Sequence, residues 1–143
     1  MQLETILNEW EVDSKIDITQ LEINQQDISK LHVKYLRYRG HENLKLKKLQ
    51  AQLRALKLQK YEHYTEGPSK ETQHWHLPAR GKILKSDAKE WYIEADNDVN
   101  TKQLEIDYAQ EKVETLDSII RMVHNRHYLL SNIHERIKWT GGG

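Results

Sequence analysis

The chain has 143 residues, of which 37% are hydrophobic, 31% are charged and none is cysteine. This length suits one domain. Because the apolar fraction is low, a single chain cannot form a large hydrophobic core, and we expect part of its apolar surface to be buried against further copies or a partner. The lack of cysteine excludes disulfides and thiolate metal sites. No apolar run reaches the roughly 18 residues of a membrane span, so we expect a soluble, cytoplasmic protein without a membrane partner.

The net charge of zero conceals a strong partition along the chain. Residues 30–60 contain ten Lys or Arg and a single acid, Glu42, whereas residues 1–29 and 88–117 each carry six more acids than bases. Like charges that accumulate on one helix destabilise it unless groups of opposite charge neutralise them. Two interpretations therefore remain open: the acidic segments neutralise the basic segment, or a nucleic-acid backbone does so.

The N-terminal part of the chain shows helical periodicity. Apolar residues at helical spacing predict a short amphipathic helix over residues 3–11, and a break follows at residues 13–17. Thr19, with Glu22 three residues later, forms a capping box. This pair predicts the start of a second, longer helix.

The second helix carries the basic segment. Gly40 weakens a helix by about 1 kcal/mol relative to Ala, so a kink or short interruption is anticipated there. Beyond it, a stripe of leucines predicts a seam that packs on another helix. The stripe comprises Leu46, Leu49, Leu53 and Leu56. Residues 65–82 contain both prolines without any periodicity, which predicts a loop.

The C-terminal half is also predicted to be helical. Ser86 and Asp87 can cap a helix that runs to about Ala95, and the polar run 96–101 interrupts or recaps it. One or two further helices then extend to Trp139. The expected architecture is one all-α domain of long amphipathic helices in a helical hairpin or bundle. Its parts are N-terminal helices at 1–66, a loop at 67–85, C-terminal helices at 86–139 and a flexible tail at 140–143.

Motifs for catalysis or metal binding are incomplete. The Gly-Lys pair at 81–82 lacks the preceding glycine of a phosphate-binding loop. The run 96–101 imitates the first ligands of a calcium loop, but Thr101 stands where that loop requires Gly, so helix capping explains the run better. His124 and His127 share a helix face without a third zinc ligand at a recognisable spacing. We therefore expect no enzyme, with no catalytic residues, metal or cofactor.

Two segments resemble a known family. The stretch LKLQKYEHYTEG, residues 56–67, resembles the basic-then-aromatic segment of phage recombination mediators of the UvsY type. The stretch RHYLLSNIHERIKW, residues 126–139, resembles the ending of the same family. The resemblance implies an all-helical, ring-like homo-oligomer, a hexamer or heptamer, in the cytoplasm of an infected host cell. It further implies binding to single-stranded DNA and loading of a RecA-like recombinase onto strands covered by single-strand-binding protein, without hydrolysis.

The basic helix supplies the predicted DNA-binding residues, because Lys and Arg neutralise phosphates and tyrosine rings stack on bases. These residues are Lys45, Lys47, Lys48, Arg54, Lys57, Lys60, Tyr61 and Tyr64. The apolar C-terminal segment supplies the predicted oligomer interface. Its residues are Tyr128, Leu129, Ile133, Ile137 and Trp139. The sequence thus favours a recombination mediator that acts in recombination, repair and recombination-dependent replication. The alternative is a structural helical-bundle or coiled-coil adaptor that binds no nucleic acid.

Overall fold

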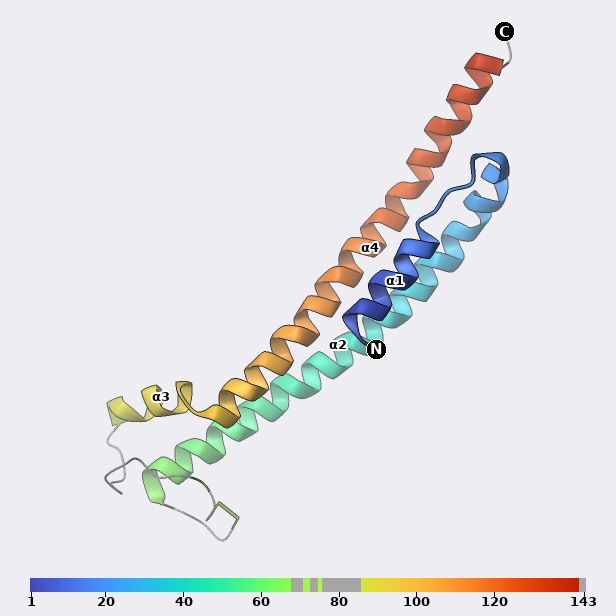
Figure 1. Ribbon diagram of the computed structural model, residues 1–143. Helices are drawn as coiled ribbons and strands as arrows, with labels where there is room; N and C mark the ends of the chain where they lie inside the picture. Colours follow the sequence, from blue (N-terminus) through green and yellow to red (C-terminus); the bar gives the residue numbers. More distant parts are fainter. Residues whose placement is uncertain (68–70, 73–74, 76–85, 142–143) are drawn as a thin grey trace. The chain divides into compact units, whose positions relative to one another are not determined.

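The computed structural model describes residues 1–67, 71–72, 75 and 86–141, and in this part of the chain the regular elements are all helices (Figure 1). They are α1 (Leu3–Asp13), the short 3-10 helix η1 (Ile18–Gln20), α2 (Leu21–Glu66), α3 (Ser86–Glu94) and α4 (Asn97–Gly141). The predicted all-α class is confirmed. None of the described helices is apolar over a stretch long enough to cross a bilayer.

The second helix begins differently from the sequence-based expectation. Thr19 does not cap it; instead Asp17 accepts hydrogen bonds from the Thr19 amide at 2.9 Å and the Thr19 hydroxyl at 2.6 Å. This carboxylate opens η1, and α2 follows at Leu21. An ionised acceptor makes a stronger cap than a hydroxyl, which explains why Asp17 takes the role.

Helix α2 runs for 46 residues without a break, so the anticipated interruption at Gly40 is absent. Tyr35 and Leu46, both buried, flank this glycine along the helix, and tertiary packing of this kind outweighs the roughly 1 kcal/mol cost of one glycine. The helix ends at Glu66, one residue past the loop start predicted at residue 65 and at the end of the predicted segment 1–66. Gly67 then turns the chain with a φ of +90°, and most of the predicted loop lies outside the described residues.

The chain forms two compact units, and α2 and α4 contribute residues to each. The first unit comprises residues 1–44 and 109–143, the second residues 45–108. In the first unit, α1 lies beside α2 and α4 (Figure 1). Its core is formed by Ile6, Tyr35, Leu116, Ile119 and Val123. The ring of Trp10 meets that of Tyr35 edge-on, with centroids 5.6 Å apart.

Polar contacts also hold the first unit together. Asp13, at the end of α1, accepts hydrogen bonds from Lys34 Nζ at 2.6 Å and from the Tyr35 hydroxyl at 2.8 Å. Glu42, the single acid of the basic segment, is 2% exposed and pairs with the buried Lys112 at 2.8 Å. Removal of either partner of such a buried ion pair leaves an uncompensated charge inside the fold.

The second unit buries the predicted leucine stripe. Leu46 and Leu53 are buried, and Leu49 and Leu56 are half-buried. Besides Tyr64 near the end of α2, the other apolar residues that are buried in the described part of this unit come from α3 and the start of α4. They are Ile93, Val99 and Ile106. The stripe therefore turns inward and leaves the opposite face of α2 to solvent.

Candidate nucleic-acid interface

Two of the four Lys and Arg residues in the first half of α2 are neutralised by acids of other helices in the first unit. Lys34 lies 2.6 Å from Asp13 and 3.7 Å from Glu9, and Arg39 pairs with Asp117. The interpretation that acidic segments answer basic ones is therefore correct for these positions. It does not say which groups neutralise the remaining basic residues of α2.

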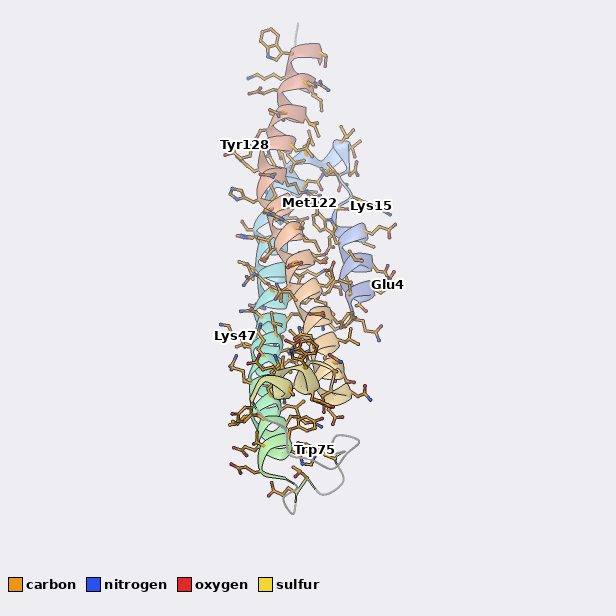
Figure 2. The ribbon with its side chains drawn as sticks, turned by 90° about the vertical axis from the view of Figure 1, so that its left-hand side faces the viewer. Glu4, Lys15, Lys47, Trp75, Met122 and Tyr128 are labelled. Carbon is orange, nitrogen blue, oxygen red and sulfur yellow. The ribbon has the colours of Figure 1, made fainter. Side chains whose placement is uncertain are left out.

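The second half of α2 presents a basic face to solvent. Four of its bases are exposed and form no ion pair within the described part of the chain: Lys47, Lys48, Arg54 and Lys57. Lys45 is exposed as well. Figure 2 shows the side chain of Lys47 directed away from the helix. Lys47, Lys48 and Arg54 lie roughly opposite the leucine stripe, whereas Lys45 and Lys57 lie to its sides. The five exposed residues together are called the basic face.

Apolar and aromatic surface interleaves with the basic face. Lys47, Arg54 and Tyr61 follow one another at intervals of seven residues, so they lie along one line on the helix. Tyr61 is 46% exposed and Leu58 is 58% exposed. A line of cations that ends in an exposed ring can contact the phosphates of a strand and stack on its bases.

Lys60 is placed differently from its predicted role. It is only 3% exposed, and its Nζ lies 2.7 Å from Asp98 and 3.1 Å from Asp96. The same ammonium sits 3.8 Å from the centroid of the Trp75 ring. In this structure the charge of Lys60 is therefore neutralised inside the second unit, and its ammonium is not exposed to solvent.

Tyr64 is held in the same network. It is 7% exposed, and its hydroxyl donates to Asp96 at 2.7 Å. Burial and this carboxylate raise the pKa of Tyr64 well above its ordinary value. Burial alone would raise the pKa of Asp96, but hydrogen bonds from Tyr64, the Val99 amide and Lys60 outweigh it and hold that pKa below its usual value.

Sequence reasoning found one part of this network and missed another. The predicted recapping of the helix at residues 96–101 is confirmed, because Asp96 accepts from the amides of Asp98 at 2.9 Å and Val99 at 3.2 Å. The pairing of Asp96 with Lys60 was not foreseen. The carboxylate of Asp96 both caps the helix and pairs with Lys60, and no local sequence pattern predicts the second role.

The predicted oligomer residues are mostly exposed on α4. Tyr128, Leu129, Ile137 and Trp139 are 65%, 50%, 45% and 84% exposed, and Ile133 is half-buried. Leu129, Ile133 and Trp139 line a groove of about 550 Å³. Leu130 turns the other way and is fully buried. The last turns of α4 thus offer an uncovered apolar surface.

The histidines singled out in the sequence share a cavity without forming a metal site. His124, His127 and His32 line a space of about 290 Å³ in the first unit. Among the described residues, however, no three His, Cys, Asp or Glu side chains are placed to hold a metal ion.

Exposed Lys and Arg residues on one long helix are a feature of helical proteins that bind nucleic acids. Residues 9–143 match the family described as "Recombination, repair and ssDNA binding protein UvsY". The chain belongs to this family. No curated protein sequence matches the chain significantly.

Solved structures agree with this assignment at the level of the fold. The chain is similar to crystal structures of the bacteriophage T4 recombination mediator protein UvsY in three lattice types. For lattice type II the TM-score is 0.82 at 17% identity, over 99% of this chain and 98% of that chain. For lattice type IV the TM-score is 0.80 at 16% identity, over 98% and 99%.

Proposed function

We propose that this protein is a non-enzymatic recombination mediator that binds single-stranded DNA through the basic face of α2. The supporting observation is the contrast along one helix. Lys34 and Arg39 are paired with acids, whereas Lys47, Arg54 and Lys57 are exposed without an ion pair in the described part of the chain. Phosphates would supply the missing negative charge and release counterions. Tyr61 adds a stacking surface beside them.

The mediator role extends this binding to protein partners. In the proposal, the protein promotes loading of a RecA-like recombinase onto strands covered by single-strand-binding protein. It does so as a homo-oligomer, a ring of six or seven subunits, joined through the exposed apolar surface of Tyr128 to Trp139. Several basic faces can then hold one strand, which raises the effective concentration of each contact. Recombinase assembly on a covered strand, measured with and without the protein, tests this role.

A matched pair of double variants tests the DNA surface. Lys47→Ala with Arg54→Ala removes two charges seven residues apart on the basic face, and Lys30→Ala with Arg37→Ala removes the same two residue types at the same spacing. The first variant should bind single-stranded DNA more weakly, with a salt slope lower by about 1.4, because each lost phosphate contact lowers it by about 0.7. The second should bind as the unaltered protein does.

Two results would contradict the proposal. Equal losses in both double variants would mean that only total charge matters and that no particular face binds the strand. A salt slope near zero for the unaltered protein would favour the alternative, a helical adaptor without nucleic-acid binding. The ion pairs of Lys34 and Arg39 are the observation that keeps this alternative in view.

A further inference from the structure

A cavity of about 630 Å³ lies beside Lys60 in the second unit. Its walls include the aromatic rings of Tyr64, Trp75 and Tyr92 together with the carboxylate of Asp98. This volume falls within the roughly 300–1,000 Å³ typical of small-molecule sites. Figure 2 shows the side chain of Trp75 near the end of α2. Two residues predicted to bind DNA, Lys60 and Tyr64, line this cavity.

The aromatic walls make contacts within the second unit. The Lys60 ammonium lies 3.8 Å from the centroid of the Trp75 ring, and the Tyr64 hydroxyl donates a hydrogen bond to Asp96. The rings of Tyr64 and Tyr92 lie 6.1 Å apart at 50°. Tyr92 is 43% exposed, so the aromatic surface remains accessible. Pre-positioned rings bind a flat ring at a lower cost in side-chain entropy.

The charge of the cavity favours some classes of ligand over others. Lys60 neutralises one of the two carboxylates, so one negative charge remains, and Asp98 keeps 59% of its side chain exposed. This remaining charge disfavours a phosphate inside the cavity. An aspartate does accept a hydrogen bond from the amino group of a base such as cytosine.

The surroundings favour a base over a basic side chain from a protein. Lys57 and Arg54 lie one and two turns before Lys60 on the same helix, and both are exposed. They would repel a cationic partner but attract the phosphates on either side of a base. Lys60, which lines the cavity, and the basic residues Lys57 and Arg54 are thus neighbours on α2 in the second unit.

We propose that the cavity receives one nucleobase of the bound strand, stacked on the aromatic walls, with its exocyclic amino group donating to Asp98. The neighbouring phosphate lies outside, at Lys57. This inference rests on the proposed function, because it assumes that the basic face holds single-stranded DNA. It adds a preference for bases that carry an amino group to a contact otherwise dominated by phosphates.

Three oligonucleotides of equal length test the inference with the full chain: oligo-dC, oligo-dT and a strand of abasic sites. The unaltered protein should bind in the order dC, dT, abasic. Asp98→Asn should remove the advantage of dC over dT, which we expect to be about two- to tenfold. Trp75→Leu should weaken binding to dC and dT by about 5- to 100-fold, with little change for the abasic strand.

Matched variants control for indirect effects. Trp91→Leu removes a tryptophan of α3 that is 79% exposed, and it should leave all three affinities unchanged. Trp75→Phe should restore most of the binding that Trp75→Leu loses, because a phenyl ring still stacks. Should Trp75→Leu fail to fold, ultraviolet crosslinking of the unaltered protein to oligo-dC with one 5-iodocytosine replaces it. The crosslink should map to Trp75 or Tyr92.

The outcomes separate the two levels of inference. If the unaltered protein binds none of the strands, the proposed function fails and the base pocket fails with it. If it binds all three equally, or if Trp75→Leu binds dC as tightly as before, the pocket is overturned while the basic face stands. The cavity would then be left to a ligand of another class, such as a basic side chain of a protein.

Discussion

Lys57 and Lys60 lie one helical turn apart and have the same chemistry, yet the structure gives them different environments. Lys57 is exposed, whereas Lys60 is buried against Asp96 and Asp98. An exposed cation is available to a ligand and contributes little to stability. A buried cation holds its neighbours in place, and its removal leaves their charge without a partner.

Alanine at these two positions should therefore affect different properties. Lys60→Ala leaves Asp96, whose side chain is 7% exposed, without its cation, and we expect a loss of about 3 kcal/mol in the free energy of unfolding. Lys57→Ala should change stability by less than about 0.5 kcal/mol but weaken binding to single-stranded DNA. Denaturant unfolding and strand titration measure the two effects. Equal stability of the two variants, with equal losses of DNA affinity, would make Lys60 a phosphate contact.

Asp13 links stability to pH in the first unit. Burial would raise the pKa of Asp13, but hydrogen bonds from Lys34 and Tyr35 outweigh it and lower that pKa from 3.8. A carboxyl whose pKa is lower in the folded state stabilises the fold above its unfolded pKa, and this contribution disappears as pH falls through the folded value.

Asp13→Asn should therefore weaken the acid dependence of stability. Between about pH 6 and about pH 3, we expect the melting temperature of the variant to fall less than that of the unaltered protein. Asp107→Asn, on an exposed position of α4, serves as the control and should leave the acid dependence unchanged. An unchanged acid dependence in Asp13→Asn would mean that this carboxyl is not ionised in the contact described.

At the scale of helices, the spacing of apolar residues predicted the features that depend on neighbouring residues alone. The helix of residues 3–11 and the inward leucine stripe were foreseen, because periodicity alone sets which face of a helix is apolar. The true cap, Asp17, was missed because two neighbouring side chains can cap the same turn. The partners of Lys60 could not be found, since Asp96 lies 36 residues further along and only the tertiary fold brings it near.

Two glycines allow a test of backbone effects alone. A Cβ added at Gly40 or at Gly67 would meet no atom within 4 Å. Gly40 lies inside α2, so Gly40→Ala should raise the free energy of unfolding by about 0.5 to 1 kcal/mol. Gly67 has a φ of +90°, so Gly67→Ala should lower it by about 1 to 2 kcal/mol. Thermal unfolding measures both. Destabilisation by Gly40→Ala would indicate that another surface packs closely on α2 at that point.

At the scale of the whole molecule, the end of α4 is exposed in a single chain. Trp139 is 84% exposed and Ile137 is 45% exposed. Burial of each large apolar side chain contributes roughly 1.5 to 3 kcal/mol, so a few such residues per subunit can hold an assembly together. Assembly in turn would let several basic faces contact one strand.

Charged residues at these positions should separate the subunits. Ile137→Glu with Trp139→Glu leaves the buried Leu130 in place and should yield single subunits that bind single-stranded DNA more weakly. Met122→Glu, at a 47% exposed position elsewhere on α4, is the control and should change neither property. Sedimentation and strand titration measure them. If the double variant remains a large oligomer, the assembly surface lies elsewhere; if it is monomeric and binds as tightly as before, multivalency is not the source of affinity.

The placement of the tryptophans allows the unfolding of each unit to be followed by intrinsic fluorescence. Trp10 packs edge-on against Tyr35 in the core of the first unit, and Trp75 lies over the Lys60 ammonium in the second. Indole emission shifts to longer wavelength when a buried ring becomes hydrated. A chain that keeps only Trp10 and a chain that keeps only Trp75 would each follow one unit. Coincident emission changes in denaturant would show that both units unfold in one cooperative step, and separate changes would show that each has a stability of its own.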